Sequence, residues 1–319
     1  MRSLLALAAV AATASVASAA SADRVVKSPG RVLALARSGF NVAFLSGPYK
    51  GHCGPHVELW DLATGGVRKL GRHTDDFCSE GPSTGSGITD IAVARDRVLW
   101  LAYTGGNLRD WILYTATPTR PTERRLEFKE VDVDAPPPIV VGTGSEWVLP
   151  YAVGSTVKVL SYNGRRQYTW QAPGQVTNLT SYGPQVAVFV RGGKCYVLSP
   201  RGAVLQTYMF RPGAVQELAL GGRGLVVQLP GGKIEVHNGA RVQRFSIPAQ
   251  GKMLDYAGNI LLYRLGGTLR GRFLFSGKDG ALRTALLGAV ETNGLSYALG
   301  TRVGSIAWAT LTSMISPPR

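Results

Sequence analysis

The stretch Val57-Glu-Leu-Trp-Asp-Leu-Ala-Thr-Gly-Gly-Val-Arg-Lys-Leu70 indicates the fold of this chain more directly than any other. It reads as an alternating strand, a turn rich in Asp, Thr and Gly, and a second strand that carries basic side chains. Two strands joined by a turn of this composition are typical of a β-hairpin. Further hairpins of the same pattern begin at Trp111, Val157, Lys194, Lys233 and Arg272.

The six hairpins recur at a nearly regular spacing. Equivalent positions in them are Trp60, Tyr114, Ser161, Ser199, His237 and Phe275, which are 54, 47, 38, 38 and 38 residues apart. Two more apolar strands precede each hairpin, as residues 32–36 and 42–45 precede the first. Four strands in a unit of about 40 residues is the period of a β-propeller blade.

We therefore predict an all-β fold, a β-propeller of seven four-stranded blades, with six blades as the alternative. After the sixth hairpin the chain holds one more strand pair, residues 295–299 and 305–311. Residues 23–28 form an extra strand ahead of the first unit, and we expect this strand to complete the last blade and close the ring. No helix longer than two turns is expected in residues 23–319, which we interpret as a single domain. Two stacked β-sandwiches would leave the regular period unexplained.

The first hairpin also carries a family resemblance. Trp60-Asp61 resembles the third-strand signature of WD-repeat propellers, in which Trp-Asp precedes the turn to the outer strand. The other units lack this pair. At the level of architecture the chain resembles secreted bacterial WD-repeat-like and TolB-like propellers. The resemblance implies a scaffold for binding, and it brings no catalytic residue with it.

The first 22 residues have the pattern of a signal peptide. Arg2 gives a positive start, residues 4–16 are apolar and rich in alanine, and Ala17-Ser-Ala19 and Ala20-Ser-Ala22 offer small residues for cleavage. The apolar run is shorter than the ~20 residues that span a bilayer. We expect an exported protein, extracellular or located in the periplasm or cell envelope, with no transmembrane segment.

The composition is that of a globular, strongly basic protein. Hydrophobic residues make up 45% of the chain, and 35 Lys and Arg against 20 Asp and Glu give a net charge of +15. Many basic residues fall on predicted outer strands and the turns before them: Arg68, Lys69, Arg120, Arg124, Arg125, Arg165, Arg166, Arg201, Arg241, Arg244, Lys278 and Arg283. They either attract an anionic envelope polymer or protect the outer edges from aggregation. We expect no specific nucleic-acid partner.

The order of the strands is enough to sort the connections between them by face. With the strands of a unit named a to d in chain order, antiparallel pairing puts the b–c and d–a connections on one face and the a–b and c–d turns on the other. We call these the b–c face and the a–b face. Long connections at residues 46–56, 71–87, 104–110 and 127–138 are expected on the b–c face of the first two units, and insertions on one face indicate a binding surface. The alternative for residues 127–134 is that they extend the outer strand of the second unit, which Pro136-Pro-Pro138 then ends. Candidate binding residues there are His52, His56, His73, Asp75, Asp76, Trp111, Glu130, Asp132, Asp134 and Trp147. The two tryptophans are candidates for stacking on a sugar or an aromatic ligand.

Cysteine and histidine cluster in the same connections. Because the protein is expected to be exported, Cys53 and Cys78 are predicted to form a disulfide. The alternatives are a zinc or copper site drawn from His52, His56 and His73 with Asp75 or a thiolate, and histidines hydrogen-bonded to the neighbouring aspartates. The acidic groups of these loops could also hold calcium, although no spacing resembles an EF-hand. We expect no metal and no cofactor.

The sequence thus favours an exported, monomeric, non-enzymatic binding scaffold. Its partner would be a protein or an anionic envelope polymer, held by the long connections of the first two units. The alternative is a propeller enzyme, a lyase or a hydrolase, with His52, His73 and Asp75 on the same face. No catalytic arrangement is recognisable, and Gly81-Pro-Ser-Thr-Gly85 lacks the preceding strand and following helix that a nucleophile elbow requires.

Overall fold

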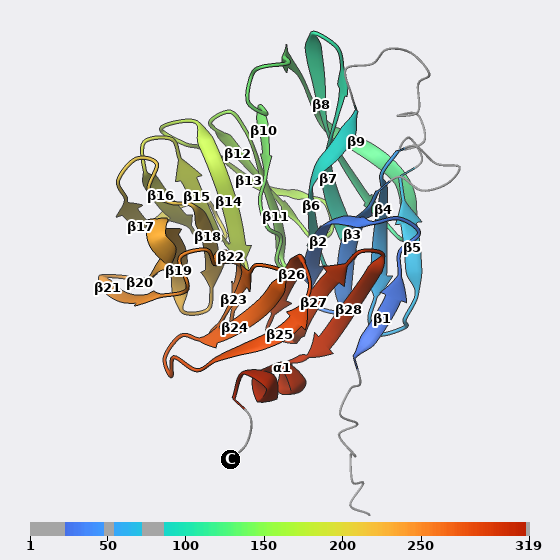
Figure 1. Cartoon of the computed structure of the whole chain (residues 1–319). Coiled ribbons are helices and arrows are strands. Elements are labelled where there is room, and N and C mark those ends of the chain that lie inside the picture. The colour runs from blue at the N-terminus through green and yellow to red at the C-terminus, as the bar shows by residue number, and fades with distance from the viewer. Residues whose placement is uncertain (1–22, 48–53, 72–85, 317–319) are drawn as a thin grey trace, which may run out of the picture.

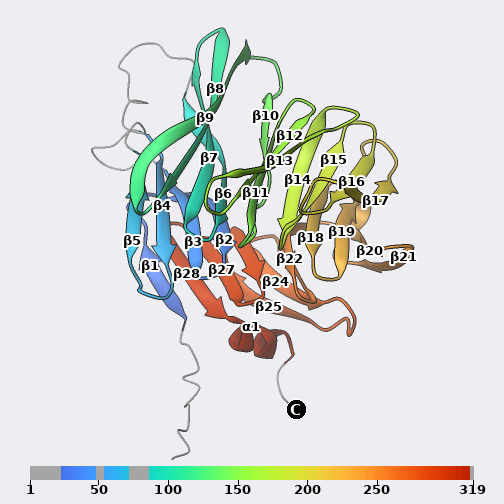
Figure 2. The ribbon, with the colours of Figure 1, turned by 180° about the vertical axis from the view of Figure 1, so that it is seen from behind.

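The computed structural model describes residues 23–47, 54–71 and 86–316. Its strands form seven separate four-stranded antiparallel sheets, arranged as blades around a ring (Figure 1; Figure 2 shows the other side). The seven-bladed β-propeller predicted from the repeat is therefore confirmed. The innermost strands of successive blades contact one another around the ring, as β2 (Val32–Ser38) does with β6 (Gly87–Ala94).

Each blade runs outward from strand a to strand d in the order of the chain. The first blade is β2, β3 (Asn41–Ser46), β4 (His56–Asp61) and β5 (Val67–Leu70), and the second is β6, β7 (Arg97–Gly105), β8 (Leu108–Thr117) and β9 (Arg120–Asp132). The third is β10 (Ile139–Val141), β11 (Val148–Val153), β12 (Thr156–Ser161) and β13 (Arg166–Gln171), and the fourth is β14 (Val176–Tyr182), β15 (Gln185–Val190), β16 (Lys194–Leu198) and β17 (Val204–Met209). The fifth is β18 (Glu217–Gly221), β19 (Gly224–Leu229), β20 (Lys233–Asn238) and β21 (Arg241–Ser246), with a short 3-10 helix at Pro230–Gly232. The sixth is β22 (Lys252–Ala257), β23 (Ile260–Leu265), β24 (Thr268–Phe273) and β25 (Asp279–Thr284).

The predicted basic residues all lie on the outer strands of these blades or on the c–d turns before them, which confirms their expected placement.

The seventh blade closes the ring with strands from both ends of the chain. β26 (Leu287–Glu291), β27 (Gly294–Leu299) and β28 (Arg302–Ala307) are its three inner strands, and β1 (Arg24–Lys27) is its outer strand. β1 lies antiparallel to β28, with Arg24 opposite Ser305 and Lys27 opposite Arg302. An ion pair between Asp23 and Arg283 adds a contact to the sixth blade. The expected closure by residues 23–28 is confirmed.

The core lies between the blades rather than inside one layer. The buried hydrophobic residues form seven clusters, and each cluster joins two neighbouring blades. The first hairpin contributes Trp60 to this core. Trp60 is 1% exposed and packs with Phe44 and with Val303 of the last blade. The next residue, Asp61, accepts hydrogen bonds from the Ala63 N–H and the Thr64 hydroxyl, each at 2.8 Å, and so fixes the c–d turn.

The second blade is longer than the others. β7, β8 and β9 have 9, 10 and 13 residues, and they extend past the rest of the ring at the b–c end (Figure 1). Residues 104–110 are therefore mostly strand around a tight turn, and β9 continues to Asp132. The expectation of a long loop at 104–110 is wrong. Of the two interpretations of residues 127–138, the structure supports the extended outer strand, which continues to Asp132. The pairing of β8 with β9 continues through both segments, with Leu108 opposite Asp132 and Asp110 opposite Glu130.

The end of the chain also differs from the prediction. α1 (Trp308–Ile315) follows β28 directly, so the expected strand at residues 305–311 ends at Ala307. Leu311 and Ile315, one helical turn apart, are buried against the last two blades. Gly271 permits this approach, because a Cβ there would lie 2.5 Å from Ile315 Cδ1. Among the described residues, no helix is long and apolar enough to cross a membrane.

Candidate functional site

Six of the predicted site residues lie outside the described residues: His52, Cys53, His73, Asp75, Asp76 and Cys78. The Cys53–Cys78 disulfide, the zinc or copper alternative and the enzyme alternative all depend on them and stay predictions. In the part of the chain that the structure describes, no group of three or more His, Cys, Asp or Glu residues could hold a metal ion.

Two other predicted residues are buried. His56 begins β4 opposite Ser46 and is 1% exposed. Trp111 is 3% exposed and packs against Tyr103, with 5.4 Å between ring centroids, in the cluster that joins the second and third blades. The expectation that Trp111 stacks on a ligand is therefore wrong, because the extended sheet turns its side chain toward the next blade.

The acidic residues Glu130, Asp132 and Asp134 are exposed at the b–c end of the second blade, with Glu130 and Asp132 on β9. Asp132 and Asp134 lie close together, since the Asp134 N–H donates to Asp132 Oδ1 at 3.2 Å. Residues directly opposite each other in an antiparallel pair point to the same side of the sheet. The pairs Leu108–Asp132, Asp110–Glu130 and Ile112–Phe128 therefore share one side of the β8–β9 pair.

We name five residues of this side the projection surface: Leu108, Asp110, Phe128, Glu130 and Asp132. Leu108 is 53% exposed and Phe128 is 44% exposed, although both are large apolar side chains. The guanidinium of Arg125 lies 5.7 Å from the ring centroid of Phe128. On this surface the pair Asp110–Glu130 lies between two exposed apolar side chains, Leu108 on one side and Phe128 on the other, and Asp132 lies opposite Leu108.

Trp147 lies on the other face of the ring. It ends the connection from β10 to β11, which is an a–b connection, and its carbonyl accepts a hydrogen bond from the Tyr162 N–H of the c–d turn at 3.0 Å. The expectation that Trp147 lies near the b–c face is therefore wrong. Its side chain is nevertheless 49% exposed, and it borders the central cavity of the ring.

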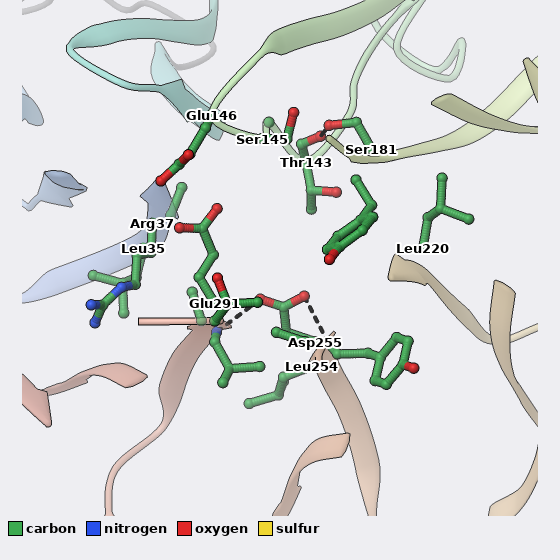
Figure 3. A pocket seen from close by; sticks show the side chains of 18 of the residues that line it. Leu35, Arg37, Thr143, Ser145, Glu146, Ser181, Leu220, Leu254, Asp255 and Glu291 are labelled. Atoms are coloured by element: carbon green, nitrogen blue, oxygen red, sulfur yellow. Dashed lines mark hydrogen bonds between the residues drawn. The ribbon is translucent and has the colours of Figure 1, made fainter. Parts of the chain in front are cut away.

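The central cavity opens between the innermost strands near the a–b face, and its volume is about 270 Å³ (Figure 3). All seven blades contribute to its wall. Its lining residues include Leu35, Arg37, Ile91, Glu146, Trp147, Ser181, Tyr182, Leu220, Leu254, Asp255, Val290 and Glu291. The wall therefore mixes apolar, aromatic and ionisable side chains.

Burial raises the pKa of two carboxyl groups in the cavity wall, those of Asp255 and Glu291. Asp255 accepts hydrogen bonds from the N–H groups of Tyr256 at 2.8 Å and of Val290 at 2.9 Å, and burial raises its pKa to about 6. Glu291 accepts a hydrogen bond from the Gly39 N–H, and burial raises its pKa to about 7. Each carboxyl thus ionises less readily than it would in water.

Arg37 supplies a positive charge to the cavity wall, and its guanidinium donates hydrogen bonds to neutral oxygen atoms. Nη1 donates to Ser296 Oγ and to Ser305 Oγ at 3.0 Å each, and Nε donates to Asn293 Oδ1 at 3.2 Å. Burial lowers the pKa of this guanidinium to about 10, so it stays charged at neutral pH. Among the described residues, no ion pair joins Arg37 to a carboxylate.

The hydroxyl groups near the cavity bind protein atoms. Thr143 Oγ1 donates to Thr180 Oγ1 at 2.8 Å, Ser181 Oγ donates to the Thr143 carbonyl at 2.7 Å, and Ser145 Oγ donates to the Gly183 carbonyl at 2.5 Å. These bonds fasten the a–b connection of the third blade to the fourth blade. None of these hydroxyls pairs with a basic side chain that would activate it as a nucleophile.

Sequence reasoning did not identify Arg37, Asp255 and Glu291 as site residues. A signal was present, because each is an ionisable residue in or at the end of an otherwise apolar strand a, as Arg37 is in Val-Leu-Ala-Leu-Ala-Arg. The innermost strands of a propeller meet at one axis. Charged residues in several strands a therefore come together although they are distant in sequence.

Comparison with known proteins gives a likeness of fold only. No family model and no curated protein matches the chain. A chain in the crystal structure of the mitotic checkpoint complex is 14% identical, with a TM-score of 0.57 over 95% of this chain and 99% of that one. This chain has a WD-repeat-like β-propeller fold. Sqt1 of Saccharomyces cerevisiae (12% identity, 89% and 97% covered, TM-score 0.45) and Raptor of Chaetomium thermophilum (14%, 89% and 29%, 0.49) are more distant in structure. At these identities the likeness extends to the propeller and to nothing finer.

Proposed function

We propose that this WD-repeat-like propeller is an exported, non-enzymatic binding scaffold and that a protein partner docks on the projection surface. The observation that carries the proposal is the extended sheet of the second blade, which presents Leu108 and Phe128 to solvent. Exposed apolar side chains rimmed by polar groups are typical of protein interaction sites. The N-terminal pattern of residues 1–22 supports the proposed export.

The charges of the projection surface favour a protein over an anionic polymer. Asp110, Glu130 and Asp132 share one side of the sheet with the two exposed apolar side chains, whereas the chain as a whole carries a net charge of +15. An anionic polymer would be repelled here and attracted to the basic outer strands elsewhere on the ring. A partner protein that presents Lys or Arg side chains next to apolar side chains would be complementary to this surface.

The test compares two exposed phenylalanines on opposite faces. Phe128→Ser removes one of the two exposed apolar side chains of the projection surface. Phe40→Ser is the matched control, because Phe40 is 62% exposed at the a–b turn of the first blade. Proteins from the exported fraction that bind the wild type are identified, purified and titrated against each variant.

We expect Phe128→Ser to weaken binding of the purified partner about tenfold or more, as loss of a central aromatic contact does, and Phe40→Ser to leave it unchanged. Equal affinities of the partner for the wild type, Phe128→Ser and Phe40→Ser would refute the site. So would the finding that the protein binds an anionic polymer and that neither substitution affects this binding. Export is tested on the same material by intact mass. A chain that starts after Ala19 or Ala22 supports it, and an uncleaved chain contradicts it.

A further inference from the structure

We propose that the central cavity binds an aliphatic cation, of the class of a lysine or arginine side chain or a free polyamine, beside Glu146, Glu291 and the ring of Trp147. This cavity lies near the a–b face, whereas the projection surface lies at the b–c end of the second blade. The inference goes beyond the proposed function and does not depend on it.

Two carboxylates from distant blades converge at one position of the wall. Glu146 belongs to the a–b connection of the third blade, and Glu291 ends β26 of the seventh. Both reach the turn at Gly39, where the N–H binds Glu291 and where an added Cβ would lie 2.7 Å from Glu146 Oε1. Figure 3 shows the two carboxylates pointing toward each other. Their mutual repulsion also contributes, after burial, to the raised pKa of Glu291.

The protein itself does not neutralise this pair with a salt bridge. The charge of the nearby Arg37 lowers the pKa of Glu291 and so offsets part of the rise, but the hydrogen bonds of Arg37 go to Asn293, Ser296 and Ser305. Among the described residues, no ion pair includes Glu146 or Glu291. The chain has 35 Lys and Arg for 20 Asp and Glu, so cations are abundant elsewhere in it. A cation supplied by a ligand would relieve the repulsion between the two carboxylates.

An aromatic ring stands beside the carboxylates. Trp147 borders the cavity and is 49% exposed, so its indole is open to a ligand. An indole face attracts ammonium and guanidinium groups. The neighbouring Arg95 shows this attraction within the protein, but its guanidinium lies 3.9 Å from the Tyr162 ring and 5.8 Å from the Trp147 ring. Arg95 is thus held mainly by the tyrosine.

The deeper wall suits an aliphatic stem. Leu35, Leu220 and Leu254 line the cavity, and the nearby hydroxyls are occupied by bonds to the protein. A volume of about 270 Å³ is small for a folded segment of a partner and leaves room for a single extended chain of atoms. The combination of apolar stem and cationic head therefore matches the chemistry of the wall better than a bare metal ion does.

The test titrates small cations into the purified protein at pH 8 and low salt, by calorimetry. The probes are butylammonium, 1,4-diaminobutane and the blocked peptide acetyl-Gly-Lys-Gly-amide, with butanol as the uncharged control. Glu146→Gln removes one carboxylate from an exposed side chain, so the fold is preserved. Glu217→Gln is the control, because Glu217 pairs with Lys252 and lies outside both the cavity and the projection surface.

We expect all three cations to bind and butanol not to bind. Glu146→Gln is expected to weaken the binding of butylammonium about fivefold or more, because a charge-assisted contact is lost, whereas Glu217→Gln is expected to leave it unchanged. Tighter binding of the peptide than of the diamine identifies a protein side chain as the natural source, and the reverse order identifies a free polyamine. Binding is also expected to weaken from pH 8 to pH 6, because Glu291, with a pKa of about 7, takes up a proton over this range and loses its charge. The charged groups that face Glu291 are Glu146, Asp255 and Arg37.

Three results would overturn the proposal. They are no saturable binding of any cation, equal binding of butanol, and equal affinities of wild type and Glu146→Gln for butylammonium. None of them bears on the projection surface, because the probes are small molecules and the variants of Phe128 and Phe40 are read out with a protein partner. Unchanged partner binding in Phe128→Ser would likewise refute the projection surface alone and leave the cation site standing.

Discussion

Arg37, on the innermost strand of the first blade, donates a hydrogen bond of 3.0 Å to the hydroxyl of Ser305, 268 residues later, in the last blade. The same nitrogen donates to Ser296, and both serines are buried. The guanidinium therefore links the first blade to the seventh blade through buried hydrogen bonds. Closure of the ring rests on this buried contact as well as on the pairing of β1 with β28.

Arg37→Met is expected to lower the free energy of unfolding by about 2–4 kcal/mol, because it leaves buried hydroxyls without their donor. Urea denaturation followed by tryptophan fluorescence measures the change. Arg244→Met is the control, since the Arg244 side chain is 71% exposed in its pair with Glu235 and its loss should cost less than about 1 kcal/mol. Equal midpoints for Arg37→Met and wild type would show that β1 alone closes the ring.

Removal of the outer strand of the last blade tests the other half of the closure. A chain that starts at Gly30 lacks β1 and exposes the edge of β28, whereas a chain that starts at Asp23 keeps the pair. We expect the shorter chain to melt at a lower temperature and to associate as its concentration rises, because unpaired edges add strands from other molecules. Thermal melting and size-exclusion chromatography measure both effects. A shorter chain that stays monomeric with an unchanged melting temperature would contradict the role given to β1.

Glu291 makes a pH dependence predictable. Its pKa is about 7 in the folded protein against an ordinary 4.5, so the folded state binds the proton more tightly than the unfolded state. Ionised Glu291 therefore lowers the free energy of unfolding above pH 7, and the cost disappears as the pH falls toward 4.5. Asp255, with a pKa of about 6, acts in the same direction.

Glu291→Gln removes the buried negative charge that lowers the stability, and the amide oxygen of the glutamine can still accept a hydrogen bond from the Gly39 N–H. We expect the variant to be more stable than wild type by about 1–2 kcal/mol at pH 8, with the difference shrinking by pH 5. Urea denaturation at several pH values measures it, and Glu130→Gln, whose carboxyl is exposed, should show no such difference. A constant difference across pH 5–8 would mean that Glu291 is not buried in a charged form at pH 8.

The propeller could be predicted from sequence because its evidence is local and repeated. Each hairpin shows its own alternation and turn chemistry, and the orphan strand at residues 23–28 needed a partner that only an incomplete last blade offered. The site could not be predicted in the same way. Arg37, Asp255 and Glu291 come together only because their strands share the axis of the ring, and nothing local in the chain marks that meeting.

The placement of two tryptophans failed for separate physical reasons. Trp147 follows the three-residue strand β10, which is too short to stand out as a strand a, so the pattern alone places its connection on the wrong face. Trp111 directly follows residues 104–110, where a loop is expected, and the strand that instead continues through this segment buries its ring. At the end of the chain, Leu311 and Ile315 are spaced for a helix face, but the apolar run also fits a strand.

The last prediction concerns Cys195, which is 1% exposed on β16 and whose pKa burial raises to about 12. Since the thiolate is the reactive form, iodoacetamide at pH 8 should leave Cys195 unmodified in the folded protein and alkylate it in urea. Peptide mapping by mass spectrometry measures both. The same denatured, unreduced sample tests the predicted Cys53–Cys78 disulfide, because the chain has 3 cysteines and would then take up one alkyl group rather than three. Rapid modification of Cys195 in the folded protein would mean that the contact between the fourth and fifth blades opens, since Cys195 belongs to the cluster that joins them.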